Sequence, residues 1–273
     1  MDTTMWLEGD LLANGIRLHF TRNACSTLPP LVLLHGSSDS GACWVSVARA
    51  LANDYDLIMP DARGHGLSEA PQWGYEADTM AEDVAGLIRT LGLVRPYLMG
   101  HSMGAATAAA CAAAHPDLVS ALVLCDPPWW DEEPPAPTEE QYRERARQVE
   151  QMRAMSIEEL KAMARAEHPD WPEVELGPWA ESKQQHSPYH MVPPRWPRPS
   201  FRELVIKIQC PVLLITADPE RGALVTPEVA AEAASLWREG RVVHIPGAGH
   251  SIRREQFAPY IEAVRAFLGE MDA

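Results

Sequence analysis

Positive charge is scarce in this sequence. The 23 lysine and arginine residues face 38 aspartate and glutamate residues, which gives a formal net charge of -15 at pH 7. Nucleic acids and anionic membranes attract basic surfaces, so this deficit argues against both as partners. The acidic excess favours solubility and says nothing more specific about the protein.

Cysteine is also scarce, and its arrangement excludes a disulfide framework. The five cysteines are odd in number and scattered, with no C-x-x-C pair: Cys25, Cys43, Cys111, Cys125 and Cys210. This usage is typical of free thiols in a reducing compartment. Residues 1–6 show no basic region followed by an apolar core, as a secretory signal would have. We therefore expect a cytoplasmic protein.

Long hydrophobic runs are missing as well. The longest run of small apolar residues, 103–114, is far shorter than the roughly 20 residues that cross a bilayer. The chain has 273 residues, of which 46% are hydrophobic, and that is enough to bury a sizeable core. We expect one large α/β domain with an insertion.

Short apolar runs alternate with longer helical stretches at both ends of the chain. The six runs, each typical of a strand buried on both faces, are residues 31–34, 56–59, 96–99, 121–124, 212–215 and 242–245. Residues 11–20 are broken by Asn14-Gly15, a strong signal for a two-residue hairpin turn at a sheet edge. The pattern predicts an α/β fold with a mostly parallel, doubly wound sheet.

Between residues 128 and 200 this alternation stops, and proline, tryptophan, methionine and charge take over. Thr138 and Ser156 each begin a capping box, which predicts helices starting near Glu139 and Ile157. Eight prolines are expected to break the remainder into short pieces: Pro169, Pro172, Pro178, Pro188, Pro193, Pro194, Pro197 and Pro199. We interpret residues 128–200 as a helical cap inserted between two core segments, 1–127 and 201–273.

Aromatic residues gather in this cap. Five of the nine tryptophans lie there: Trp129, Trp130, Trp171, Trp179 and Trp196. Such a surface either walls an apolar pocket or fastens an irregular insertion to the core. We take Trp129, Trp130 and Trp179 as candidates for the wall of a substrate pocket.

Residues 100–104 read Gly-His-Ser-Met-Gly, a G-x-S-x-G motif between an apolar strand and an alanine-rich helix. Glycines let the chain turn sharply and leave the serine exposed at the apex of the turn. This context makes Ser102 the candidate nucleophile.

Ligands of open α/β sheets bind at the carboxyl ends of the strands, so further catalytic groups are expected just after the other strands. His250 follows the last strand in a Gly-Ala-Gly-His loop, before a helix expected over residues 251–268. It is the candidate base, because imidazole titrates near neutrality. Backbone N–H groups of Ser37 and Met103 are candidates for an oxyanion hole, the second at a helix N-terminus.

Together these motifs resemble the α/β-hydrolase superfamily over almost the whole chain outside the cap. Residues 33–36 are similar to its oxyanion turn, residues 61–68 to its D-x-R-G-x-G-x-S loop, residues 100–104 to its nucleophile elbow and residues 247–250 to its histidine loop. The resemblance implies the fold but not the reaction. Within the second motif we interpret Arg63 and His65 as structural residues that hold the loop.

The carboxylate that completes a Ser-His-acid triad stays open. The superfamily usually places it after the penultimate strand, where this chain offers Asp218 or Glu220 in a loop with extra residues. Asp126 is a rival and our first choice, because it directly follows residues 122–125 and some members carry their acid after that earlier strand. The acid must hold His250 in the correct tautomer.

The sequence thus predicts a serine hydrolase that cleaves carboxylic esters or lactones through an acyl-enzyme and needs no cofactor. Alternatives are a carbon-carbon bond hydrolase of diketone-like substrates, with Lys183, Arg195 or Arg198 anchoring a carboxylate, and a slow-turnover ligand receptor. His186 and His190 have i, i+4 spacing, but Pro188 lies between them and no third ligand is evident, so no metal is expected.

Overall fold

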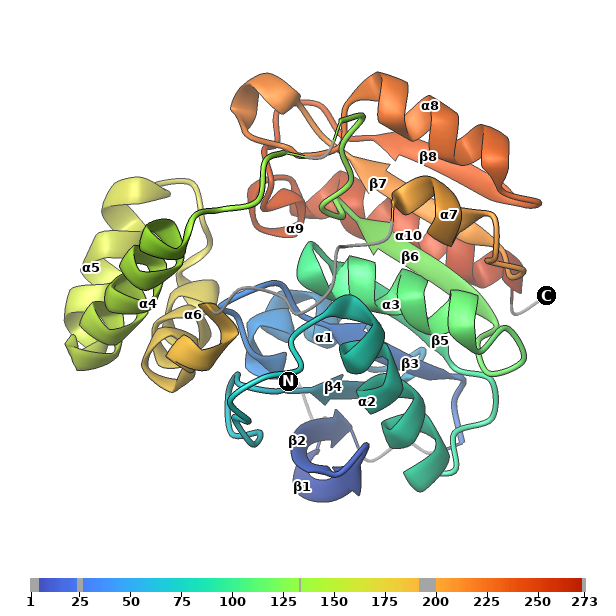
Figure 1. The fold of residues 1–273 in the computed structure, drawn as a ribbon. Helices are drawn as coiled ribbons and strands as arrows, with labels where there is room; N and C mark the ends of the chain where they lie inside the picture. Colours follow the sequence, from blue (N-terminus) through green and yellow to red (C-terminus); the bar gives the residue numbers. More distant parts are fainter. Residues whose placement is uncertain (1–4, 24–26, 133, 192–199, 272–273) are drawn as a thin grey trace.

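The computed structural model describes residues 5–23, 27–132, 134–191 and 200–271. Its centre is an eight-stranded sheet in the order β1-β2-β4-β3-β5-β6-β7-β8. The strands from β4 to β8 run parallel, whereas β1 and β2 form an antiparallel hairpin that joins β4 at one edge. The predicted mostly parallel sheet is confirmed (Figure 1).

The strand bounds lie close to the predicted runs. The strands are β1 (Trp6–Ala13), β2 (Ile16–Asn23), β3 (Pro30–Leu34), β4 (Asp56–Pro60), β5 (Tyr97–His101), β6 (Ala121–Cys125), β7 (Val212–Thr216) and β8 (Gly240–His244). Asn14 and Gly15 turn the hairpin with φ of 47° and 78°, as a two-residue turn of this kind requires.

Helices cover both faces of the sheet, as a doubly wound fold demands. One core is closed by α2 (Ala77–Thr90), α3 (Met103–Ala114), α7 (Phe201–Val205) and α8 (Pro227–Leu236). The opposite core is closed by α1 (Val45–Leu51), α9 (Ile252–Glu255) and α10 (Phe257–Met271). Along β6, Leu122 and Leu124 enter the first core while Val123 and Cys125 enter the second.

The cap helices are α4 (Glu139–Ala154), α5 (Ile157–Glu167) and α6 (Glu173–Gln185), followed by the 3-10 turn η2 (Pro188–Met191). They lie beside the sheet, at the left in Figure 1. Both predicted capping boxes are present, because the side chains of Thr138 and Ser156 accept from the backbone N–H groups three residues on. The cap has a small core of its own around Leu160, Trp171 and Trp179.

Two helix predictions were wrong. Pro178 does not end α6: it lies inside the helix, whose next turn is held by Trp179 and Ala180 in the cap core. That packing offsets the one hydrogen bond that a proline removes. In contrast, the expected single helix after His250 is interrupted at Gln256, because the ring of Pro259 conflicts with an unbroken helix through Glu255.

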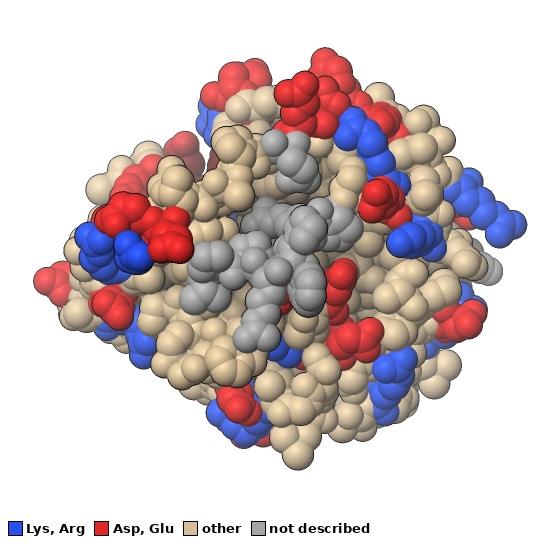
Figure 2. All heavy atoms as spheres, viewed as in Figure 1, with Lys and Arg blue, Asp and Glu red and all other residues tan. Residues whose placement is uncertain are grey.

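Acidic and basic side chains interleave on the face shown in Figure 2. On α4, Arg143 pairs with Glu139 and Arg147 pairs with Glu140, at 2.8 and 2.9 Å. Exposed pairs of this kind contribute little to stability. Among the described residues, no helix is both long and apolar enough to cross a membrane. The four described cysteines are buried free thiols, and Cys25 lies outside the described residues.

Candidate active site

Ser102 stands at the sharp turn between β5 and α3. Its φ of 52° and ψ of -117° are a strained combination for a residue with a side chain. A Cβ at Gly100 would lie 2.3 Å from the carbonyl oxygen of Gly104, and one at Gly104 would lie 2.0 Å from that of Leu34. The chain can make this turn only because both flanking residues are glycine.

His250 lies beside the elbow and is bound to one of the three candidate acids. Its Nδ1 is 2.6 Å from Oδ2 of Asp126, a carboxylate with no exposed surface. The same carboxylate accepts from the backbone N–H groups of Leu224 and Val225 at 2.9 to 3.0 Å. An acceptor at Nδ1 leaves the Nε2 lone pair of His250 available as a base.

The other two candidate acids are not at the imidazole of His250. Asp218 accepts instead from the Gly247 N–H at 2.7 Å and lies 3.0 Å from Nε2 of His244. Glu220 is exposed in the 3-10 turn η3 (Pro219–Arg221). The extra residues of this loop therefore place backbone N–H groups on Asp126 and do not place a carboxylate on His250.

The turn after β3 lies against the elbow. A Cβ at Gly36 would be 3.5 Å from the Cβ of Ser102, so the backbone of Ser37 follows directly beside the serine. His35 is buried and holds this turn: its Nδ1 donates to the Gly36 carbonyl at 2.8 Å, and its Nε2 accepts from the Ala62 N–H at 2.9 Å. Burial lowers the pKa of His35 and keeps it neutral.

Met103 is the first residue of α3, so its N–H opens a helix N-terminus next to Ser102. Within the described part of the chain, neither the Ser37 N–H nor the Met103 N–H has a hydrogen-bond acceptor. Two adjoining donors without an acceptor are what an oxyanion hole offers to developing negative charge.

His101 was overlooked in the sequence as the variable residue of the motif. In the structure it is buried, its ring centre is 4.7 Å from that of His250, and its Nε2 donates to the His250 carbonyl at 2.9 Å. Burial, with His250 and Arg253 nearby, holds the pKa of His101 well below its usual range. Nothing in the sequence signals this contact, because residues 101 and 250 meet only through the fold.

A buried charge network joins the cap to the loop after β3. Asp39 lies 3.1 Å from both Arg253 and Arg254 and 3.4 Å from Lys183 of α6. Lys183 also donates to the carbonyl oxygen and the hydroxyl of Ser38, at 2.8 and 2.9 Å. The cations hold the pKa of Asp39 well below its usual range. The cap is thereby fixed to the residue that follows Ser37.

The candidate pocket tryptophans occupy different places. Trp129 is buried in the main core, stacked on Phe201 and tilted against Trp237. Trp130 is half-buried, and Trp179 packs in the cap core with Lys183 over its ring. Their role at a pocket wall stays a prediction, and Trp196 lies outside the described residues.

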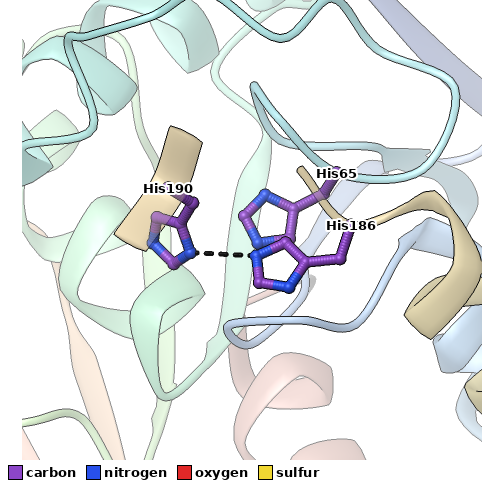
Figure 3. Close-up of side chains that lie close together, drawn as sticks. All are labelled: His65, His186 and His190. Carbon is purple, nitrogen blue, oxygen red and sulfur yellow. Dashed lines mark hydrogen bonds between the residues drawn. The ribbon is translucent and has the colours of Figure 1, made fainter. Parts of the chain in front are cut away.

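A second group of histidines lies between the core and the cap. His65, from the loop after β4, meets His186 and His190, and the ligand atoms of the three imidazoles all lie within 4.8 Å of one another (Figure 3). The sequence showed no third partner for the histidine pair, because His65 is remote in the chain. Arg63, by contrast, holds its loop as expected, through two bonds to Asp83 of 2.6 and 2.5 Å.

A family model described as the alpha/beta hydrolase fold matches residues 29–253. The chain belongs to this family. The family match and the two relatives described next identify the chain as a hydrolase. The 2-(acetamidomethylene)succinate hydrolase of Mesorhizobium japonicum is 42% identical over 98 residues, which are 36% of this chain and 35% of that protein. The N-formylmaleamate deformylase of Pseudomonas putida is 29% identical over 272 residues, 97% of this chain and 98% of that protein.

Solved structures agree on the fold over the whole length. The crystal structure of E-2-(acetamidomethylene)succinate hydrolase has a TM-score of 0.80 and 27% identity and covers 97% of this chain and 100% of that one. A thermophilic esterase from Thermogutta terrifontis, with malate bound, has a TM-score of 0.72 and 25% identity, over 98% of this chain and 100% of that one. The predicted α/β-hydrolase fold is thus confirmed.

Proposed function

We propose that this hydrolase cleaves carboxylic esters or lactones through an acyl-enzyme on Ser102. The observation that carries the proposal is the 2.6 Å contact of His250 with the buried Asp126, next to a serine on a strained elbow. A base oriented by a carboxylate beside an exposed hydroxyl is the arrangement that activates a serine nucleophile.

The first half of the reaction follows from these positions. His250 Nε2 takes the hydroxyl proton of Ser102 while Oγ bonds to the substrate carbonyl carbon. The negative oxygen of the tetrahedral intermediate accepts from the N–H groups of Ser37 and Met103. Collapse breaks the bond to the leaving oxygen, which takes the proton from His250; in a lactone this oxygen stays attached to the acyl chain as a hydroxyl.

The second half returns the enzyme to its starting state. Water gives a proton to His250 and attacks the acyl carbon. The new tetrahedral intermediate expels Oγ of Ser102, which recovers its proton from His250, and the carboxylic acid leaves. Asp126 keeps His250 oriented throughout, because its carboxylate is itself held by the backbone N–H groups of Leu224 and Val225.

A second candidate reaction is the hydrolysis of an N-formyl or other N-acyl amide. It is favoured by the deformylase relative, which matches over 97% of this chain and whose name gives N-formylmaleamate as its substrate. The same acyl-enzyme steps apply, with nitrogen as the leaving atom. His250 then has the larger task, because an amine leaves only when it is protonated.

The carbon-carbon bond alternative needs a cation free to hold a substrate carboxylate. Lys183 is a poor candidate, because it is buried and already bound to Ser38 and Asp39. Arg195 and Arg198 lie outside the described residues. The receptor alternative differs in kinetics alone: a receptor releases about one equivalent of product from a chromogenic ester and then stalls, whereas an enzyme keeps turning over.

The nucleophile is tested with Ser102→Ala. We expect this variant to lose both ester hydrolysis and covalent labelling by a fluorophosphonate probe. Ser37→Ala is the matched control, since Ser37 lies beside the same site and acts through its backbone; it should label normally. Undiminished labelling of the Ser102 variant would refute the assignment.

The reaction is tested by comparing kcat/KM for acyl esters of graded length, aliphatic and aromatic lactones, and N-formyl amides. The proposal requires esters or lactones to be the better substrates. If N-formyl amides are turned over with a kcat/KM at least tenfold higher, the second candidate replaces the first. If the site is correctly assigned, the Ser102→Ala protein hydrolyses neither the esters and lactones nor the N-formyl amides.

A further inference from the structure

The three histidines between core and cap come from two segments that are remote in the chain and that the fold brings together. His65 belongs to the loop between β4 and α2, His186 ends α6 and His190 belongs to η2. A backbone bond of 2.8 Å from the Ser187 N–H to the Gly64 carbonyl holds the two segments in register. The rings in Figure 3 face one another across this junction.

His65 is oriented as a ligand would be. Its Nδ1 donates to the carbonyl of Arg63 at 2.9 Å, so the lone pair of the ring is on Nε2. The side chain has no exposed surface, and within the described part of the chain Nε2 has no hydrogen-bond partner. A buried polar atom left this way costs free energy, whereas histidines that bind metals typically donate their other nitrogen to a carbonyl in the same manner.

His186 and His190 supply two further nitrogens at a suitable spacing. Nε2 of His186 lies 3.1 Å from Nδ1 of His190. Two imidazole nitrogens on one tetrahedral zinc ion are about 3.3 Å apart, given zinc-nitrogen bonds of about 2.0 Å. Without a metal, one ring donates its proton to the other across this gap; with a metal, that proton moves to the outer nitrogen of its ring.

The surroundings of the cluster also suit a metal. The side chains of His65 and His186 are both buried. Two of the neighbouring cations are paired, Lys183 with Asp39 and Arg63 with Asp83.

We propose that His65, His186 and His190 bind a divalent transition metal such as Zn²⁺ and thereby fasten the cap to the core. Three imidazoles without a carboxylate suit zinc, cobalt, nickel or copper and do not suit magnesium or calcium. The fourth position of a tetrahedral ion would take water or a carboxylate.

Binding requires a modest ring movement. His65 and His186 are stacked with their centres 4.6 Å apart and 21° between their planes, so their lone pairs lie in nearly parallel planes. Both rings meet His190 edge-on, at 63° and 60°. Directing all three lone pairs at one ion therefore requires the two stacked rings to rotate, and χ2 is a soft torsion.

Metal binding is tested on tag-free full-length protein after treatment with a chelator, by calorimetric titration with Zn²⁺ and by the visible spectrum with Co²⁺. We expect one equivalent per chain with micromolar or tighter affinity, and the intense bands of tetrahedral cobalt. At 100 times the dissociation constant, Zn²⁺ should raise the Tm by about 5 °C.

Three variants make the result specific. His190→Ala and His186→Asn should each weaken Zn²⁺ binding at least tenfold, while His244→Ala, an exposed histidine at the sheet edge, should leave it unchanged. His190 is only partly buried, so His190→Ala carries the test even if His186→Asn fails to fold. Binding of less than a tenth of an equivalent to the wild-type chain, undiminished binding to His190→Ala, or an octahedral cobalt spectrum would each overturn the proposal. These readouts do not depend on the proposed esterase or lactonase reaction.

Discussion

The sheet end and the cap interface hold their polar groups by different means. At the sheet end, the backbone positions most of the polar groups: two glycines shape the elbow at Ser102, and the N–H groups of Leu224 and Val225 fix Asp126. At the cap interface, charged side chains position one another. They form one buried network of Asp39, Lys183, Arg253, Arg254 and Glu175.

The difference teaches how each region tolerates change. Backbone donors persist when a side chain is replaced, so a substitution at the sheet end alters the chemistry and leaves the fold in place. A buried ion pair does not survive such a replacement, since removing one partner leaves the other charge without compensation in a region of low dielectric. We therefore expect activity losses in the first region and stability losses in the second.

The largest effect is expected at the sheet end, for Asp126→Asn. An amide at this position favours the wrong tautomer of His250, and kcat should fall by about 10⁴-fold. Steady-state kinetics with an ester substrate measure this change. Asp218→Asn is the matched control and should stay within tenfold of wild type, because Asp218 contacts His244 and Gly247. Equal losses in both variants would contradict the assignment of the acid.

Next comes Arg254→Met at the cap interface. This change leaves Glu175 and Asp39, both buried, short of a cation, and the free energy of unfolding should fall by about 3 to 5 kcal/mol. Denaturant unfolding followed by circular dichroism measures it. Arg241→Met, which breaks an exposed pair with Glu270, should cost no more than about 1 kcal/mol. Similar losses in the two variants would remove the contrast between buried and exposed pairs.

A third effect depends on pH and concerns His101. Its pKa in the folded chain is below its unfolded value, chiefly through burial and then through His250 and Arg253, with Asp39 opposing. The unfolded chain therefore binds more protons as pH falls below about 6.5, and folding stability drops, by about 2 kcal/mol at pH 5 for a histidine that stays neutral.

The variant that tests this is His101→Gln, which retains a donor for the His250 carbonyl. Its Tm should fall less steeply than that of the wild type between pH 7 and pH 5. Tm profiles with identical slopes would show that His101 does not contribute to acid destabilisation.

The smallest effect is expected where the two regions meet, for Lys183→Met. Asp39 keeps Arg253 and Arg254 as partners, so the fold should be retained. Losing the bonds to Ser38 frees the residue after Ser37, so kcat/KM should fall by about tenfold, equivalent to about 1.4 kcal/mol. Lys161→Met, on the cap helix α5 with an ion pair to Glu158, serves as the control and should leave kcat/KM unchanged. An unchanged kcat/KM for Lys183→Met would mean that the cap does not position the oxyanion turn.

The sequence by itself determined the sheet, its hairpin, the capping boxes of α4 and α5 and the elbow at Ser102. Each of these depends on local information: a four-residue apolar run, an Asn-Gly pair, a serine or threonine three residues before a glutamate or glutamine, or two glycines around a turn. Residues that are neighbours along the chain determine such features, so they can be predicted without knowledge of the fold.

Only the tertiary structure decided which groups meet across long separations. It placed Asp126 rather than Asp218 on His250, His101 against the same histidine, Lys183 on Asp39, and His65 beside His186 and His190. These partners are far apart in the chain, and the 3-10 turn and extra residues of the loop after β7 shift every register count. Their encounters follow from how sheet, loops and cap pack together, which local residue preferences do not encode.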